Sequence, residues 1–581
     1  MAGFLVLTVI LLPWLGAIVV WLAGDERPRA QHGYAVAFSV LTGLVSITLL
    51  FFTSMEPVVR LPLAKAFGEL TFVPDGLAVS LTAIAAVIGS LAVIFSVDYM
   101  RGAAQLGRYY FLVLFFIGAM TGLVLSGNLL FTFFFWEITA LCSYGLISFY
   151  NDDPKAVAGG LKALIITQVG GVGLLAGTLI AFASLGSLQI SDLLAKASTL
   201  SEDALAWIAF SFLIAAAAKS AQFPFHTWLP DAMEAPTPVS ALIHAATMVN
   251  AGIYLLARFY PAFESVPAWT TSVLLVGLIS ALISSLAALT GNDLKRVLAY
   301  STVSQLGYMV YAIGAGGVLA SQFHLLSHAV FKALLFLAAG AVIHSVGTRD
   351  MSRMGGLGEK MPFVRNVFLL GGLALAGVPI LNGFWSKELI LEIGLEHSPV
   401  WMYALMLLGA GLTAFYTFRM IWLVFFGKER EDLHVHGAGA AMKASLGVLA
   451  GGTLLTWLLF GGLSDLLSST LPVHALEPES LTHMVSMISF APATWFALAI
   501  VALGFGLAWM QSRGSHFFGG GWLHPLVDSS FGFEWVNQLV VRGTHQLAAQ
   551  LSTLQTGELN WNIFGIIGAL LAVLIILWLG A

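Results

Sequence analysis

Eight charged or titratable side chains lie in or beside apolar stretches long enough to cross a membrane. They are Glu137, Lys219, His244, His324, His328, Lys332, Lys387 and Glu388. A lysine at the centre of a membrane helix costs roughly 3 kcal/mol or more, so such residues usually mark an ion or proton pathway. The residue types therefore indicate a membrane protein that conducts protons or small cations.

Two of the lysines adjoin interruptions in their apolar segments. Lys219 precedes Pro224 and Pro230, and Lys387 follows the stretch Gly377-Val-Pro-Ile-Leu-Asn-Gly383. Paired interrupted spans in the two halves of a transporter are typical of ion sites, where unwound backbone lines a cavity. The alternative is that Pro and Gly are simply frequent in membrane helices. We favour the ion site because each interruption coincides with a lysine.

His324, His328 and Lys332 follow one another at intervals of four residues. This spacing places all three on one face of a helix, over about 12 Å at 1.5 Å per residue. Histidine titrates near neutral pH, so the stripe is suited to a water-bridged proton relay. The alternative is a polar contact between helices, with the histidines satisfied by hydroxyl groups.

Glu137 lies between Phe131-Thr-Phe-Phe-Phe-Trp136 and Ile138-Thr-Ala-Leu-Cys-Ser143. A carboxylate in such surroundings must bind a proton or a cationic partner. We expect a contact with Lys219, two spans later, that switches between a closed and an open pair. The alternative is a static buried pair, which would contribute little net stability.

The remaining candidates extend the same series. His244 follows Lys219 closely in sequence and is expected to relay protons; alone, it would equally suit a satisfied core histidine. Lys387 and Glu388 lie in Phe384-Trp-Ser-Lys-Glu-Leu-Ile-Leu391 and are expected to form one end of the path. The alternative for this pair is an ordinary interfacial contact, since charges near span ends reach water cheaply.

The composition places these residues in a polytopic membrane protein. Of the 581 residues, 59% are hydrophobic and 9% are charged, against about 25% charged in soluble domains. Segments of spanning length, about 17–25 residues, predict an all-α fold with about sixteen transmembrane helices. They lie near 3–23, 35–53, 75–97, 110–126, 129–149, 160–184, 205–226, 238–258, 269–289, 296–314, 320–345, 363–385, 400–426, 444–464, 491–511 and 562–580. The first is expected to be a retained helix, because no basic region precedes it.

Loop charges predict the orientation. Basic residues cluster after odd-numbered spans, at Arg27, Arg29, Arg101, Arg108, Lys155, Lys295, Arg296, Arg349, Arg353, Lys360, Lys428, Arg430 and Lys443. Loops after even-numbered spans carry few, chiefly Arg60, Lys65 and Lys196. The positive-inside rule places the odd loops in the cytoplasm and both termini on the periplasmic side of a bacterial inner membrane.

Other chemistry finds little support in the sequence. The single Cys142 excludes disulfides within the chain and a cysteine-ligated cluster built by this chain alone. We expect no cofactor, no metal site and no nucleic-acid partner. The stretch 531–551 is amphipathic and too polar to span, so it is predicted to lie along the membrane surface or on a neighbouring subunit.

Several strings of residues carry a family resemblance. They are Trp228–Val249, Asp293–Tyr308, the stripe from His324 to Lys332, and Gly383-Phe-Trp-Ser-Lys-Glu388. Over roughly residues 60–430 the chain resembles the antiporter-like subunits of respiratory complex I, of membrane-bound hydrogenase relatives and of Mrp-type Na⁺/H⁺ antiporters. The late amphipathic stretch and final span resemble the largest such subunit of complex I.

The resemblance implies two inverted five-helix bundles, at residues 110–258 and 259–430. N-terminal helices occupy 1–109, and C-terminal helices with the lateral segment occupy 431–581. It also implies roles: Glu137 matches the pair-forming glutamate, Lys219 its partner, His244 the bridging histidine, Lys332 the central lysine, Lys387 the terminal lysine, and His324 and His328 histidines of the central helix. Glu388 stands where complex I usually has aspartate.

One departure concerns the sixth span. The complex I subunit usually has Thr-Arg-Val-Gly-Asp there, whereas this chain has Thr167-Gln-Val-Gly-Gly171 and loses both charges. That change is closer to the Mrp-type pattern, whereas Ala414-Phe-Tyr-Thr-Phe-Arg419 resembles complex I. The sequence therefore lies between the two branches.

The resemblance implies the ion-pumping subunit of a NADH/quinone-type, hydrogenase-type or Mrp-like assembly. Such a subunit moves H⁺, with or without exchange for Na⁺, beside other membrane subunits in the lipid bilayer. Two alternatives stay open: a stand-alone secondary cation/proton antiporter, and a membrane subunit of a proton-driven uptake system.

Overall fold

The computed structural model describes residues 1–62, 68–429, 435–513 and 530–554. Two units separate by their internal contacts, residues 1–527 and 528–581. The longer helices of the first unit are α1 (Ala2–Ala23), α2 (Pro28–Leu49), α3 (Gly76–Tyr99), α4 (Leu106–Leu125), α5 (Leu129–Ile147), α6 (Pro154–Leu185), α8 (Glu202–Lys219), α11 (Asn250–Phe263), α12 (Trp269–Thr290), α13 (Leu294–Gly314), α14 (Val318–Val346), α16 (Pro362–Ala376), α17 (Asn382–His397), α18 (Val400–Ile421), α19 (Ala440–Leu455), α20 (Phe460–Thr470) and α22 (Pro492–Ser512). Shorter helices are α7 (Ile190–Lys196), α9 (Trp228–Asp231), α10 (Thr237–Ala241), α15 (Leu357–Lys360) and α21 (Leu481–Phe490).

Twelve segments in the described part of the chain are long and apolar enough to cross a membrane. They coincide with twelve of the sixteen predicted spans, which confirms a polytopic helical fold. Three further predicted spans are helices that are shorter or more polar, namely α8, α13 and α16. The last predicted span, 562–580, lies outside the described residues. Of these three, α8 carries Glu202, Asp203 and Lys219, α13 carries Lys295 and Arg296, and α16 has 15 residues.

Two predicted spans are broken where Pro and Gly occur. The segment predicted at 205–226 is helical only to Lys219, after which Pro224 and Pro230 cannot donate backbone hydrogen bonds. The segment predicted as one span at 363–385 is two helices, α16 and α17. Gly377 ends α16 with φ 85°, a left-handed conformation suited to glycine. Hydropathy averaged over the segment cannot show this break.

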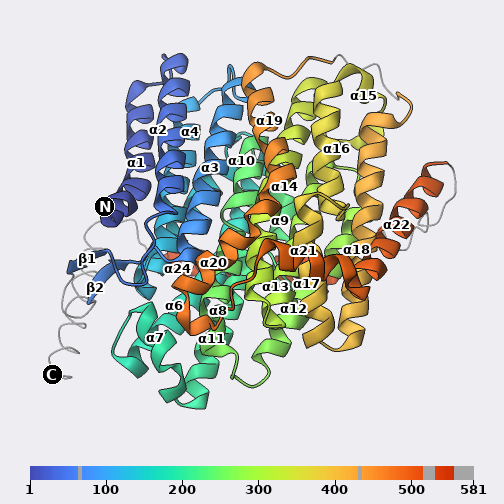
Figure 1. Cartoon of the computed structure of the whole chain (residues 1–581). Coiled ribbons are helices and arrows are strands. Elements are labelled where there is room, and N and C mark those ends of the chain that lie inside the picture. Colours follow the sequence, from blue (N-terminus) through green and yellow to red (C-terminus); the bar gives the residue numbers. More distant parts are fainter. Residues whose placement is uncertain (63–67, 430–434, 514–529, 555–581) are drawn as a thin grey trace. The chain divides into compact units, whose positions relative to one another are not determined.

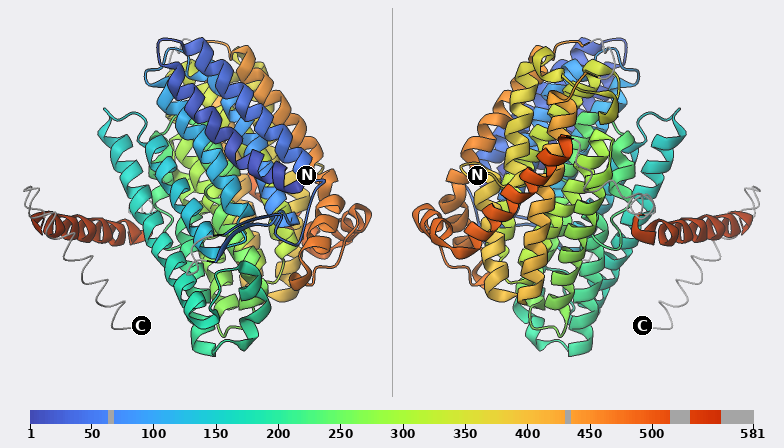
Figure 2. Two further views of the ribbon diagram at one scale, coloured as in Figure 1. Left: turned by 90° about the vertical axis from the view of Figure 1, so that its left-hand side faces the viewer. Right: turned by 90° about the vertical axis from the view of Figure 1, so that its right-hand side faces the viewer.

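The helix α14 lies at the centre of the first unit (Figures 1 and 2). It packs against α3, α10, α13, α16, α17 and α19. Its residues from Phe323 to Val342 are almost all buried. A helix that other helices cover on all sides lies in the core, and the charged or polar groups on it are buried with it. The predicted stripe of His324, His328 and Lys332 is therefore at the middle of the bundle.

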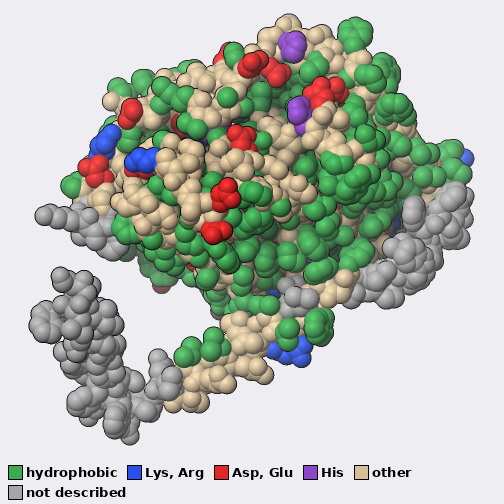
Figure 3. Space-filling model, turned by 90° about the horizontal axis from the view of Figure 1, so that it is seen from below, with side chains coloured by type: hydrophobic (Ala, Val, Ile, Leu, Met, Phe, Trp, Pro, Cys, Tyr) green, Lys and Arg blue, Asp and Glu red, His purple; other side chains and the backbone are tan. Residues whose placement is uncertain are grey.

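A small hairpin interrupts the helical architecture. Strands β1 (Val59–Pro62) and β2 (Glu69–Phe72) pair antiparallel, with Val59 opposite Phe72. Figure 3 shows the side that faces downward in Figure 1, where α7 lies; α7 and the hairpin both follow even-numbered predicted spans. It shows scattered Asp and Glu side chains and few Lys or Arg over an apolar surface. The periplasmic location of this face stays a prediction from the loop charges.

The second unit contains the helix α24 (Phe533–Leu554), preceded by the turn η8 (Ser530–Gly532). Trp535, Leu539 and Leu547 are exposed on it. This confirms that the predicted amphipathic stretch is helical. Its location at the membrane surface or on a partner stays a prediction.

Candidate functional site

Glu137 lies in the middle of α5, whose first turn is capped by the side chain of Asn128. Its Oε2 accepts a hydrogen bond from Nε2 of Gln168 on α6, at 2.5 Å. Gly171, one turn further along α6, leaves the space for Oε1, since a Cβ at that position would overlap this oxygen. The two positions where the chain departs from the complex I pattern thus both lie against Glu137. A neutral amide and a glycine replace a pair of charges.

Lys219 is the last residue of α8 and is completely buried. Its Nζ donates to the backbone oxygen of Trp136 at 2.8 Å and lies 4.9 Å from the centre of the indole ring. The structure differs here from the predicted direct contact, because no ion pair joins Glu137 to Lys219 among the described residues. The acceptor of Lys219 belongs to Trp136, the residue just before Glu137. The carbonyl that binds Lys219 and the carboxylate of Glu137 are therefore neighbours on α5. The switch between them stays a prediction.

His244 lies in η3 (Leu242–Ala246), a single π-helical turn between α10 and α11. Such turns occur often at functional sites because they redirect side chains. The imidazole is completely buried, and neither ring nitrogen has a hydrogen-bond partner in the described part of the chain. Its ring centre lies 5.6 Å from that of Phe336 and 6.5 Å from that of Trp228. Burying an imidazole with both nitrogens unpaired is costly, so the residue is unlike an ordinary satisfied core histidine.

The helix α14 presents the predicted stripe as expected from its spacing. His324, His328 and Lys332 are all completely buried. His324 joins three helices, since Nδ1 lies 2.9 Å from Oγ of Ser386 on α17 and Nε2 lies 3.1 Å from Oε1 of Gln305 on α13. The rings of His324 and His328 are 6.3 Å apart. The central stripe therefore contacts the residue that precedes Lys387.

The part of the stripe formed by His328 and Lys332 has fewer hydrogen-bond partners than His324. Lys332 donates to Oγ of Ser301 on α13, and its Nζ lies 5.8 Å from the ring centre of Phe336. Neither nitrogen of His328 has a partner among the residues that the structure describes. Phe336 thus lies beside both His244 and Lys332.

Lys387 and Glu388 are buried on α17 rather than placed at a surface. Nζ of Lys387 donates to the backbone oxygen of Leu375, at 2.9 Å, in the last turn of α16. The C-terminal end of a helix carries partial negative charge, so it is a favourable site for an ammonium group. Gly377 ends α16, and a Cβ at this position would lie 3.7 Å from Nζ of Lys387. The helix break therefore creates the acceptor that Lys387 uses.

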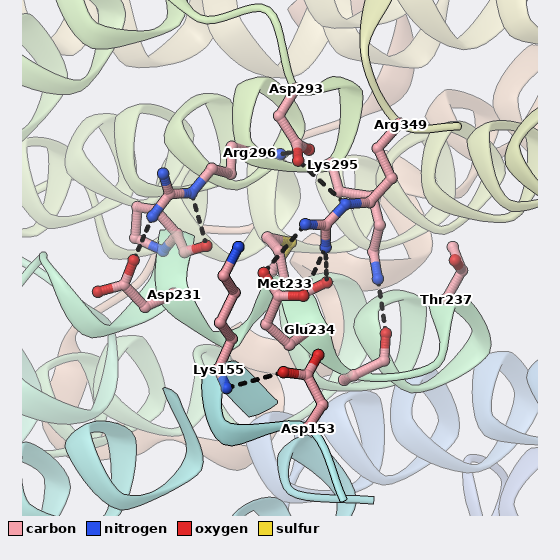
Figure 4. Close-up of polar contacts among 12 residues, drawn as sticks. Asp153, Lys155, Asp231, Met233, Glu234, Thr237, Asp293, Lys295, Arg296 and Arg349 are labelled. Atoms are coloured by element: carbon pink, nitrogen blue, oxygen red, sulfur yellow. Dashed lines mark hydrogen bonds and ion pairs between the residues drawn. The ribbon is translucent and has the colours of Figure 1, made fainter. Parts of the chain in front are cut away.

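A cluster of charged residues that was not among the predicted site residues holds the interrupted segment after Lys219 in place (Figure 4). It contains Asp231, Glu234, Asp293, Lys295, Arg296 and Arg349. Arg349 donates to both carboxylate oxygens of Glu234, at 2.9 and 3.0 Å, and lies 3.1 Å from Asp293. These contacts fasten the interrupted segment after Lys219 to the start of α13 and the end of α14.

The rest of the cluster holds the same segment from other sides. Asp231 accepts from Arg296 and from Lys162 on α6, the latter at 2.7 Å. The buried Lys295 donates to the backbone oxygen of Ala235 at 2.6 Å. Burial acts to lower the pKa of Arg349, but hydrogen bonding to Glu234 and attraction by Asp293 outweigh it and raise the pKa above its usual value. The sequence does hold a sign of this cluster. Asp231 and Glu234 are acidic, the residues just after Asp293 are basic, and side chains of opposite charge in two loops can pair.

The fold and these residues define a class of protein: a polytopic helical membrane protein with ionisable groups on interrupted core helices. Residues 126–413 match the family model described as "NADH:quinone oxidoreductase/Mrp antiporter, TM". NADH-quinone oxidoreductase subunit L of Pseudomonas aeruginosa is 37% identical over 541 residues, covering 86% of this chain and 86% of that protein. The chain belongs to the NADH:quinone oxidoreductase/Mrp antiporter family.

Two further similarities cover both branches of the family. NAD(P)H-quinone oxidoreductase chain 5 of Picosynechococcus sp. is 43% identical over 377 residues, which are 62% of this chain and 57% of that protein. A chain of the Mrp complex from Dietzia sp. DQ12-45-1b has a TM-score of 0.81 and 28% identity, covering 99% of this chain and 63% of that chain. The present chain thus spans about three fifths of each of these two relatives.

Proposed function

We propose that this chain is an ion-translocating membrane subunit of a multisubunit assembly, moving H⁺ with or without exchange for Na⁺. The observation that supports it is the series of ionisable groups from Glu137 through Lys219, His244, Lys332 and His324 to Lys387. Glu137 accepts from the neutral amide of Gln168, the three lysines and His324 contact neutral oxygens, and His244 has no partner in the described residues. A group held only by neutral partners can change its protonation state without leaving an opposite charge unpaired, which is the main cost of breaking a buried ion pair.

In the proposed mechanism the chain holds and passes charge in stages. The lysines at 219, 332 and 387 each donate to an uncharged oxygen, so each can lose its proton without leaving a carboxylate unpaired. Like charges repel strongly in a low-dielectric interior. A proton that reaches one lysine therefore favours proton release from the next. Glu137 at one end and Glu388 at the other supply carboxylates that accept or deliver the proton.

The surface around Glu137 supports a partner subunit. Glu137 is only partly buried, and its neighbours Phe134, Leu141 and Val172 are 51%, 56% and 65% exposed. An ionisable group facing lipid is costly, and a contiguous exposed apolar surface commonly marks an interface. We propose that a neighbouring membrane subunit covers this face and exchanges protons with Glu137.

The organisation and location follow from the same proposal. The interrupted helices after Lys219 and before Lys387 would occupy equivalent places in two inverted bundles, at residues 110–258 and 259–430. Both termini would face the periplasm of a bacterial inner membrane. A cysteine-accessibility measurement at the hairpin and at the loop of Arg101 tests the orientation, with only the former reactive from outside.

Transport in vesicles tests the function directly. The full chain alone and the assembly purified with it are reconstituted separately, and H⁺ movement and ²²Na⁺ uptake are measured with wild type and Lys219→Met. We expect transport by the assembly, loss of transport in Lys219→Met and none by the chain alone. Transport by the isolated chain would instead support the stand-alone antiporter. Unchanged transport by the assembly with Lys219→Met would refute the proposed path.

A further inference from the structure

A groove of about 510 Å³ opens between α3, α14 and the α19–α20 segment, away from the proton path. These helices lie side by side in the first unit (Figure 1). Its volume falls in the range of about 300–1,000 Å³ typical of small-molecule sites. Leu459 and Phe51 at its rim are 55% and 80% exposed, so it opens on the outer surface of the helical bundle.

The lining is almost entirely aliphatic. It includes Leu81, Ile84, Leu326, Val330 and Leu463, and in the described part of the chain no charged side chain lines it. Phe51 supplies its single aromatic ring. A flat aromatic headgroup would thus find little to stack on, and an anionic group would find no cation. A flexible hydrocarbon chain matches this lining best.

One polar side chain in the groove has no partner. Gln322 is 3% exposed, and neither its Nε2 nor its Oε1 has a hydrogen-bond partner among the described residues. Leaving both ends of a buried amide unpaired is unfavourable. A ligand that carries a hydrogen-bond acceptor next to a donor would satisfy both ends of this amide.

The order of polar and apolar side chains along the groove matches that of a lipid, which is polar at the membrane interface and apolar toward the membrane centre. Gln322 lies in the second turn of α14, near the same end of the bundle as Leu77 at the start of α3. Leu326 and Val330 lie four and eight residues further along α14, about 6 and 12 Å deeper at 1.5 Å per residue. A molecule with its polar part near the membrane interface and its apolar part toward the centre would match both.

We propose that this groove binds one acyl chain of a membrane glycerophospholipid. Nε2 of Gln322 donates to the ester carbonyl, and Oε1 accepts from an amine or hydroxyl of the headgroup. The chain then runs along Leu326 and Val330 toward Ile88. Because these residues share α14 with the histidine stripe, an occupied groove would also support the helix that carries the proposed path.

Photolabelling tests the position of the chain. The purified assembly is reconstituted in vesicles of phosphatidylethanolamine and phosphatidylglycerol. A trace of phosphatidylethanolamine carries a diazirine either next to the ester carbonyl or near the methyl end. We expect the first probe to label peptides around Gln322 and Leu77, and the second to label those around Val330 and Ile88. Labelling that does not depend on the position of the diazirine would overturn the proposal.

Three variants sharpen the result. Leu326→Trp fills the groove and should abolish both patterns, whereas Leu408→Trp, on the exposed face of α18, should preserve them. Gln322→Leu should reduce labelling by the carbonyl probe about fivefold, the effect of one hydrogen bond, and leave the methyl-end pattern in place. If Leu326→Trp does not assemble, Leu459→Trp at the rim replaces it. Wild-type labelling in the filled variants would contradict the proposal.

Discussion

Substitution of Gly171 by alanine should displace the carboxylate of Glu137 without destabilising the fold, and so tests whether the position of this carboxylate matters for transport. A methyl group at this position would overlap Oε1 of Glu137, while the other oxygen is held by Gln168 at 2.5 Å. The carboxylate can rotate away, because it ends a flexible side chain, but rotation breaks the hydrogen bond to Gln168. The helix itself should gain, since alanine is favoured over glycine in a helix by about 1 kcal/mol.

The expected size of the effect follows from that hydrogen bond. A bond to a charged group contributes about 1.5–3 kcal/mol, and each 1.4 kcal/mol is about a factor of ten. Glu137 is partly exposed, so the lower end applies. We expect Gly171→Ala to reduce ion flux by roughly tenfold while thermal stability stays equal or rises.

The assay is the initial rate of ion movement by the reconstituted assembly. Leu408→Ala, a change on the exposed face of α18 and away from Glu137, serves as the control. Gln168→Leu removes the same hydrogen bond from its other side, so the double variant should lose no more than either single variant. Wild-type flux in Gly171→Ala, or losses that multiply in the double variant, would refute the role assigned to Gln168.

Three further predictions concern the stability and assembly of the chain. Arg258 makes two hydrogen bonds to the buried Asp75, at 2.5 and 2.8 Å. Arg258→Met should therefore lower the free energy of unfolding by about 3–5 kcal/mol, as measured by denaturation of the purified chain. The double variant Arg258→Met/Asp75→Asn should lose less, because it leaves no unpaired carboxylate. Burial lowers the pKa of His474 to about 4, more than its hydrogen bond to the oxygen of Ala257 raises it. The unfolded chain then binds more protons between pH 6.5 and 4, so stability should fall as pH drops through this window, and His474→Gln should flatten the profile of melting temperature against pH. Deletion of residues 531–581 should release the chain from its partners in co-purification while the remaining bundle stays folded; undiminished association would place the contact elsewhere.

Periodicity was sufficient to place the central residues. The four-residue spacing of His324, His328 and Lys332 fixes their common face on any α-helix, and the surrounding apolar residues fix its burial. The polytopic fold was equally accessible, because hydropathy depends on composition over about twenty residues. These features are local, so no knowledge of the tertiary packing was needed.

Contacts between distant helices could not be obtained in this way. The acceptor of Lys219 is the backbone oxygen of Trp136, 83 residues away, and its choice over the carboxylate of Glu137 depends on how α5 and α8 pack. The break between α16 and α17 was visible as Gly377 and Pro379, but the average hydropathy of the segment concealed it. The sequence showed a departure from a family pattern at Gln168 and Gly171, but it did not show that Gln168 is the hydrogen-bond partner of Glu137.

The central claim is that ions cross this chain along the buried groups between Glu137 and Lys387. Lys332 is its most exacting test, since it is completely buried at the middle of α14 and donates only to Ser301 among the described residues. The measurement is ion translocation by the intact assembly in vesicles, with Lys332→Ala compared with wild type after both are shown to insert and assemble equally. We predict that translocation is abolished or severely reduced. Full translocation by Lys332→Ala would contradict the proposed path.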